Sequence, residues 1–199
     1  MGKAPIKETL AAALILLSKW REDAPFVDPM CGAGTFPIEA AMIAANIAPG
    51  MDRSFTAEEW ENLIPKKEWY AAITEAEDMV DRHLLETKEN RFGKMVDIQG
   101  YDIDPAMIPV CRENAERAGV LSLIHFQERD IAKMSHGKKH GVLMTNPPYG
   151  ERIEDKRNLP LLYTELREAY EGLNDWQLFV ITAYEQEEKY LGKSFKNRK

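Results

Sequence analysis

The sequence predicts an α/β protein with a mostly parallel sheet that helices cover on both faces. Short apolar runs alternate along the chain with longer helical patterns, and such alternation is typical of parallel strands joined by helical crossovers. The 199 residues are 44% hydrophobic and 30% charged, a composition that indicates a globular chain with a sizeable core and excludes a disordered one. We therefore expect one domain over residues 1–199.

Apolar spacing and helix-ending residues set the order of the elements. Pro37 suits the first turn of a helix, where a missing N–H costs nothing, and Gly119 ends another helix. The expected helices lie at about 8–20, 36–48, 67–89, 105–118 and 159–171. The expected strands lie near 26–28, 96–101, 123–127, 142–145 and 177–182. A polar, basic segment follows the last strand.

Residues 51–94 interrupt this alternation. They are polar and acidic, with Thr56 as the expected N-terminal cap in TAEE and a break at Pro65 before the long helix at 67–89. We interpret them as a helical insertion in the domain, separate from the leading helical segment at 1–20.

Charge and composition exclude several classes of protein. The net charge of −7 repels phosphate backbones and excludes a protein that coats nucleic acid by charge alone. Cys31 and Cys111 have no metal-ligand spacing and suit a reducing cytoplasmic setting, and His136 and His140 lack a third ligand nearby. The apolar run Leu10–Leu17 is too short to cross a membrane. We expect a cytoplasmic protein without a metal or a membrane span.

A glycine loop, DPMCGAGT, follows the first strand, at the sheet edge where such folds bind ligands. Gly32 and Gly34 permit close approach of a ligand, and the next helix presents free N–H groups at its start. A dinucleotide site would place a third glycine where Pro37 stands, so hydride transfer is disfavoured. A tight turn without a ligand is the alternative.

Aspartates follow the second and third strands. Asp102 in GYDID can accept two hydrogen bonds from a ribose diol, whereas Asp104 suits a helix cap before Pro105. Asp130 in RDI can accept from the amino group of a purine, although a solvated turn residue would look the same.

The motif NPPY follows the fourth strand. The side-chain carbonyl of Asn146 and the backbone carbonyl of Pro147 can both accept from one amino group, and Tyr149 offers a face on which a base can stack. Two such acceptors orient the lone pair of a planar amine toward an electrophile and stabilise the positive charge that develops. The motif therefore indicates chemistry at an exocyclic or amide nitrogen.

In this order, DPMCGAGT, GYDID, RDI and NPPY resemble class I S-adenosylmethionine-dependent methyltransferases that act on such nitrogens. More narrowly, KETLAAALILL, DPMCGAGTFPIEAA and NPPYGER are similar to the catalytic domain of bacterial THUMP-containing RNA methyltransferases. That group includes guanine-N2 methyltransferases of large-subunit ribosomal RNA, and some members are labelled DNA adenine methylases. The resemblance implies a Rossmann-like fold whose last strands are missing here, and an RNA substrate captured with a THUMP-type domain that is absent from these residues.

The resemblance also implies a role for each motif. Asp28 and the loop at 32–35 would hold the methionine end of S-adenosyl-L-methionine, Asp102 its ribose, and the residues after the second and third strands its adenine. The implied cofactor-binding residues are Asp28, Gly32, Gly34, Thr35, Asp102, Ile103, Asp130 and Ile131. The implied catalytic residues are Asn146, Pro147 and Tyr149.

Our hypothesis from the sequence is a methyltransferase acting on guanine N2 of 23S ribosomal RNA, with the base flipped out of its helix. The NPPY motif does not distinguish between planar amines. DNA adenine N6 and a protein glutamine amide are therefore alternative substrates, and a noncatalytic RNA-binding module is the alternative from another class.

Overall fold

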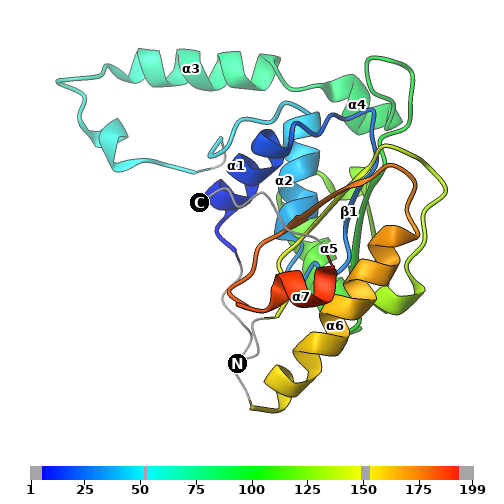
Figure 1. Ribbon diagram of the computed structural model, residues 1–199. Coiled ribbons are helices and arrows are strands. Elements are labelled where there is room, and N and C mark those ends of the chain that lie inside the picture. The colour runs from blue at the N-terminus through cyan, green and yellow to red at the C-terminus, as the bar shows by residue number, and fades with distance from the viewer. Residues whose placement is uncertain (1–5, 52, 149–152, 193–199) are drawn as a thin grey trace.

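The computed structural model describes residues 6–51, 53–148 and 153–192, with only the backbone described at 153–157. Its centre is a five-stranded, all-parallel sheet (Figure 1). The strands are β1 (Phe26–Asp28), β2 (Ile98–Asp102), β3 (Ile124–Glu128), β4 (Val142–Thr145) and β5 (Gln177–Val180), in the order β3-β2-β1-β4-β5. The predicted α/β class and parallel sheet are confirmed.

Helices cover both faces of the sheet. The helices α1 (Glu8–Ser18), α2 (Thr35–Ala44) and α5 (Met107–Arg117) share one core with alternate strand residues such as Phe26. The helices α6 (Ile153–Glu171) and α7 (Glu187–Leu191) share the opposite core with Val27 and other strand residues. Successive side chains of β1 point to opposite faces and are buried on both. This explains why β1 and β4 are apolar up to their last residue.

The strand order reverses next to β1. The chain runs outward through β2 and β3 and then returns to place β4 on the other side of β1. Ligands of open parallel sheets bind at such a switch point, outside the carboxyl ends of the strands. The segments that follow β1 and β4, which carry the glycine loop and the NPPY motif, therefore meet at the same edge.

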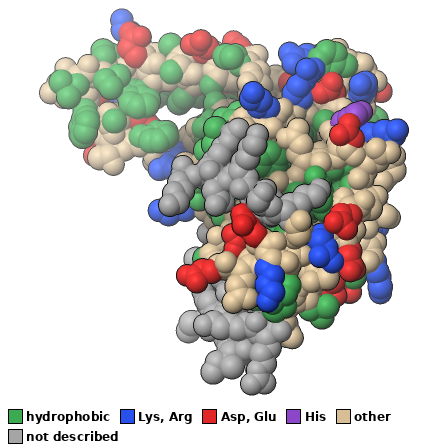
Figure 2. All heavy atoms as spheres, in the orientation of Figure 1, with side chains coloured by type: hydrophobic (Ala, Val, Ile, Leu, Met, Phe, Trp, Pro, Cys, Tyr) green, Lys and Arg blue, Asp and Glu red, His purple; other side chains and the backbone are tan. Residues whose placement is uncertain are grey.

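The insertion forms an arm that extends away from the sheet (Figure 1). It holds the short 3-10 helix η1 (Thr56–Glu59) and the helix α3 (Lys66–Asp78), neither of which buries a residue, and it returns through α4 (Arg82–Thr87). Figure 2 shows hydrophobic side chains gathered on the arm. The exposed apolar residues there are Phe55, Trp60, Leu63, Ile64, Tyr70 and Met79.

Two details of the predicted insertion are wrong. The single helix at 67–89 is two helices, because the Asp81 carboxylate accepts a hydrogen bond from the Leu84 N–H at 2.9 Å and so begins α4. Thr56 is not a cap, since Phe55 holds the N-cap position of η1 and its N–H donates to the Glu58 carboxylate at 2.8 Å.

Near the C-terminus, α6 begins at Ile153, earlier than the predicted 159, and Pro160 lies within it. The segment after β5 contains α7, which the sequence did not predict because five residues with one buried side chain, Leu191, carry little periodicity. None of the helices in the described ranges has the length and apolar character of a membrane span.

A polar cluster supports the sheet where β2 begins. Asp97 accepts from Lys138 Nζ at 2.7 Å and from Gln99 Nε2 at 2.6 Å, and it lies 3.3 Å from His136 Nε2. Burial alone would raise the pKa of Asp97, but His136, Lys138 and Gln99 together outweigh it and hold the pKa below its ordinary value. A lowered pKa in the folded state stabilises the fold above the unfolded pKa of about 4, and this stabilisation is lost as the pH falls.

We expect Asp97→Asn to lower the free energy of unfolding by about 1 to 2 kcal/mol at neutral pH, because it weakens hydrogen bonds to a charged group. The deficit should shrink as the pH falls below about 4, because Asp97 of the unfolded chain then takes up a proton while the folded chain still holds the carboxylate charged. Urea denaturation at several pH values measures both effects. Asp175→Asn is the matched control, because its pairing with His140 is exposed.

Candidate functional site

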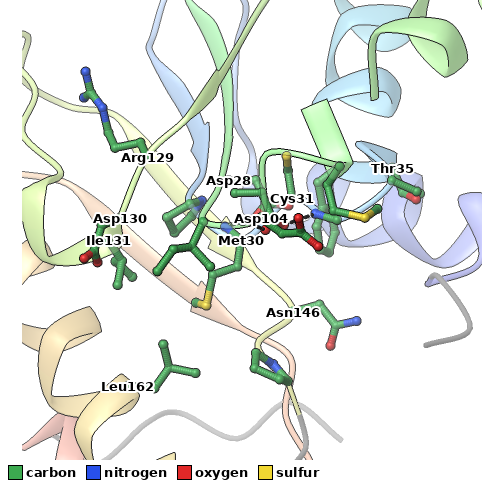
Figure 3. Close-up of a pocket in the computed structure, with 18 of the residues that line it drawn as sticks. Asp28, Met30, Cys31, Thr35, Asp104, Arg129, Asp130, Ile131, Asn146 and Leu162 are labelled. Atoms are coloured by element: carbon green, nitrogen blue, oxygen red, sulfur yellow. Dashed lines mark hydrogen bonds between the residues drawn. The ribbon is translucent and has the colours of Figure 1, made fainter. Parts of the chain in front are cut away.

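A cavity of about 490 Å³ opens at the carboxyl ends of the strands, next to the point where the strand order reverses. Its volume lies in the range of small-molecule sites, roughly 300 to 1,000 Å³. In Figure 3, Asp130 and Ile131 lie on the left of this cavity, Asn146 on the right, and Asp28 and Met30 between them. The residues that follow β1, β2, β3 and β4 thus line one cavity.

The glycine loop after β1 owes its shape to two left-handed residues. Gly32 has φ +53° and Gly34 has φ +87°. A Cβ on Gly34 would lie 3.3 Å from both Cys111 Cβ and Phe126 Cζ, whereas a Cβ on Gly32 would meet no heavy atom within 4 Å. Gly34 therefore permits close packing of the loop on the core, and Gly32 leaves open space where it lines the cavity.

Side chains of the helix α5 donate hydrogen bonds to the glycine loop. Cys111 Sγ donates to the Gly32 carbonyl at 2.8 Å, and Asn114 Nδ2 donates to the Ala33 carbonyl at 3.0 Å. Because these carbonyls are engaged by α5, the loop is held in one shape before any ligand binds.

Asp102 joins the loops that follow β1 and β2. Its Oδ2 accepts from the Gly32 N–H at 2.9 Å, and its Oδ1 accepts from the Asp104 N–H at 2.9 Å. Each carboxylate oxygen thus holds one backbone donor and can accept a further hydrogen bond. The neighbouring Asp104 accepts from the Ala106 N–H at 2.9 Å and caps the turn before α5.

Asp28 lies at the bottom of the cavity and is 2% exposed. Its Oδ1 accepts from the Met30 N–H at 3.1 Å. Burial raises the pKa of Asp28 to about 7, and the negative charge of Asp102 contributes to the shift. A bound cation beside Asp28 would therefore be favoured, since it would compensate the buried negative charge.

The part of the cavity formed by residues after β2 and β3 combines aliphatic and charged side chains. Ile103 is 68% exposed at the rim, and Ile131 is buried in the short 3-10 helix η3 (Ile131–Lys133). Asp130 caps η3 by accepting from the Ala132 N–H at 3.0 Å. The Arg129 guanidinium lies 4.6 Å above the Tyr101 ring. This end could hold a flat ring between aliphatic side chains, with carboxylates at its edge.

The NPPY segment follows β4. Asn146 is partly buried and lines the cavity together with Pro148, whereas Pro147 is buried and does not line it. Tyr149, the third predicted catalytic residue, lies outside the described residues. The Asn146 side chain can therefore contact a group in the cavity. The backbone carbonyl of Pro147 belongs to the next residue along the chain.

The lining is strongly acidic. It contains five carboxylates, at Asp28, Asp102, Asp104, Asp130 and Glu165, and one basic side chain, at Arg129. Such a cavity favours a ligand with positive charge. Among the described residues, no three His, Cys, Asp or Glu side chains are grouped closely enough to hold a metal ion.

The structure brings most of the predicted site residues together. Of the predicted cofactor residues, Gly34 alone is not among the lining residues, because it packs against the core. Four prominent lining residues were not predicted from the sequence, namely Met30, Arg129, Leu162 and Glu165. Leu162 and Glu165 are three positions apart in the helix after NPPY, and this spacing places both on one helix face. It is the sequence feature from which their place in the site could have been predicted.

Comparisons with known proteins agree with this geometry. A family model described as "RMKL-like, methyltransferase domain" matches residues 1–199. The chain is 42% identical over 199 residues to "Putative RNA methyltransferase YpsC" of Bacillus subtilis, a match that covers 100% of this chain and 49% of that protein. It is 42% identical over 166 residues to the ribosomal RNA large subunit methyltransferase K/L of Vibrio parahaemolyticus, covering 82% of this chain and 22% of the relative.

A solved structure shares both the fold and the sequence. SMU.472, described as "a putative methyltransferase complexed with SAH", superimposes with a TM-score of 0.87 and 38% identity. The match covers 98% of this chain and 49% of that chain. The chain thus spans about half the length, or less, of the relatives that it matches.

Proposed function

The chain belongs to the RMKL-like methyltransferase domain family, and from this premise we propose that its cavity binds S-adenosylmethionine and directs a methyl group to an exocyclic amine of an RNA base. The observation that carries the proposal is the meeting of Asp28, Asp102 and Asn146 in one cavity at the switch point of the sheet. A nucleotide-like ligand and a target amine would then lie within reach of each other.

The residues present suit this cofactor. The open space at Gly32 admits a ligand against the loop backbone, and both oxygens of Asp102 can accept a ribose hydroxyl. Asp28 would bind the ammonium group of the methionine end, together with the loop at 32–35. Ile103 and Ile131 would contact the adenine ring, and Asp130 would accept from its amino group.

The cofactor supplies a methyl group on a positively charged sulfur. The protein's part is to orient the nitrogen that receives it. Asn146 and the Pro147 carbonyl would accept the two hydrogens of the target amine, point its lone pair into the cavity and stabilise the charge that develops on nitrogen. Tyr149 would stack on the base.

We assign the substrate as RNA, and the target as guanine N2 of large-subunit ribosomal RNA. The names of the relatives support the RNA class, and the family resemblance of NPPYGER supports the amine. Because the net charge is −7, we expect contacts to a single extruded base to matter more than general attraction to phosphates. The domain would act in the cytoplasm, where ribosomal RNA is modified in bacteria.

Methyl transfer to ribosomal RNA from cells that lack this protein tests the assignment. Nucleoside analysis of the product should show N2-methylguanosine. N6-methyladenine in a DNA substrate, or methylglutamine in a protein, would replace the RNA assignment with one of its two rivals. Absence of any transfer, in a chain that does not bind the cofactor, would contradict the enzyme assignment.

The raised pKa of Asp28 predicts a pH-dependent affinity for S-adenosylhomocysteine, which keeps the ammonium group of the cofactor. The free protein has a pKa of about 7 at Asp28, so the carboxylate that binds the ammonium becomes more populated as the pH rises. We expect affinity to increase about tenfold between about pH 6 and pH 8. Calorimetric titrations across this range measure the change.

Asp28→Asn should weaken binding and flatten this pH dependence. Glu39→Gln is the matched control, because burial also raises the pKa of Glu39 to about 7 but Glu39 does not line the cavity. A pH dependence that survives in Asp28→Asn and vanishes in Glu39→Gln would contradict the role of Asp28.

A further inference from the structure

Glu165 is a carboxylate of the cavity to which the proposed function gives no task. It lies on α6, and Leu162, three positions before it, lines the same cavity. In Figure 3, Leu162 comes from α6 on the same side of the cavity as Asp130 and Ile131. Tyr163 and Leu166, both 0% exposed, anchor this part of α6 in the core. The backbone of α6 therefore holds Glu165 at a defined position on the cavity wall.

Asp130 faces the same end of the cavity. The helix α6 packs against η3, the turn that Asp130 caps. Burial raises the pKa of Glu165, and the negative charges of Asp130 and Glu168 raise it further. These shifts are consistent with two carboxylates that lie close enough to repel each other.

Within the described part of the chain, no cation pairs with Glu165 to relieve this repulsion. The nearest basic residue along α6, Arg167, lies 4.0 Å from Glu168, and Arg129 is engaged over the ring of Tyr101. A ligand group with more than one N–H donor would compensate both carboxylates at once.

We infer that Glu165 determines specificity for the adenine ring of the cofactor, by accepting one hydrogen of its 6-amino group while Asp130 accepts the other. This inference rests on the proposed function. The two hydrogens of that amino group lie in the plane of the ring and point in different directions. Acceptors on two elements, η3 and α6, can therefore bind both. A 6-oxo purine would instead place a third acceptor beside two carboxylates, and the cavity would reject it.

Binding of two ligands tests the inference without any turnover. S-adenosylhomocysteine carries the 6-amino group, and S-inosylhomocysteine carries a 6-oxo group in its place. We expect the unchanged chain to prefer the amino ligand by about 100-fold or more. Glu165→Gln should weaken binding of the amino ligand about tenfold, the effect of one hydrogen bond to a charged group. Glu165→Gln should weaken binding of the oxo ligand much less, because the glutamine amide can donate a hydrogen bond to the 6-oxygen.

Two further variants serve as controls for this binding experiment. Glu168→Gln is the matched control, since Glu168 lies one turn further along the same helix, is exposed and does not line the cavity. It should bind both ligands as the unchanged chain does. Asp130→Asn should reduce discrimination between the ligands in the same way as Glu165→Gln, and it keeps the test decisive if one variant folds poorly.

Equal weakening of both ligands in Glu165→Gln would overturn the inference, because it would indicate a general effect on the cavity. Unchanged affinity of Glu165→Gln for S-adenosylhomocysteine would also overturn the inference. If methyl transfer were slowed in the same variant, Glu165 would instead contact the target base. Failure of the unchanged chain to bind either ligand would be a failure of the proposed function itself, and is thereby distinguished from failure at Glu165 alone.

Discussion

Replacement of Asn146 by alanine is expected to lower the rate of methyl transfer by about 100-fold to 1,000-fold, the cost of removing one preorganised group that stabilises transition-state charge. Asn146 directly follows β4 and lines the cavity beside the loop that follows β1. Without its carbonyl, the target amine keeps a delocalised lone pair that is not directed at the cofactor. Rates at saturating S-adenosylmethionine measure this loss.

The cofactor affinity of the Asn146→Ala chain should stay nearly unchanged, because the residues proposed to hold the cofactor are elsewhere in the cavity. Asn146→Asp should retain more activity than Asn146→Ala, since a carboxylate still accepts hydrogen bonds. Asn174→Ala, at an exposed loop position outside the cavity, is the matched control and should be fully active. Normal turnover in Asn146→Ala would remove the NPPY segment from the mechanism.

Replacement of Asp102 by alanine is expected to weaken cofactor binding by about 100-fold. Two effects combine, namely the loss of acceptors for the ribose and the loss of the two hydrogen bonds, each 2.9 Å, from the Gly32 and Asp104 N–H groups. Each hydrogen bond to a charged group contributes about 1.5 to 3 kcal/mol, so the estimate corresponds to about 3 kcal/mol. Calorimetry with S-adenosylhomocysteine measures the change.

A double-mutant cycle separates ribose contact from loop support. The unchanged chain should bind a 2′-deoxyribose analogue of the ligand more weakly than the parent, whereas Asp102→Ala should bind the two alike. Asp104→Ala is the matched control, because its carboxylate caps the turn at Ala106 and should affect stability more than affinity. An undiminished preference for the ribose hydroxyl in Asp102→Ala would show that another residue contacts it.

The strands and the convergence of the site were predictable from the sequence for one physical reason. Both faces of central parallel strands are buried, so β1 (Phe26–Asp28) and β4 (Val142–Thr145) consist of apolar residues up to their last position, and their limits are visible in the sequence. Because parallel strands share one carboxyl edge, residues that follow different strands, such as Asp102 and Asn146, must meet there.

The features that were not predicted depend on tertiary contacts. The rotation of α6, which directs Leu162 and Glu165 to the cavity, is set by burial of Tyr163 and Leu166 against the sheet. The packing role of Gly34 depends on Phe126 and Cys111, which are distant in sequence. The break before α4 depends on a bond from the Asp81 N–H to the Ala45 carbonyl at 2.8 Å.

A crystal structure of this chain with S-adenosylhomocysteine would test whether the cavity at the switch point is the cofactor site. We expect a ligand in the cavity, with its ribose hydroxyls within hydrogen-bond distance of Asp102 and its ammonium group beside Asp28. Its adenine should lie between Ile103 and Ile131, with the sulfur facing Asn146. A ligand bound elsewhere, or one whose ribose does not touch Asp102, would contradict the proposed cofactor site.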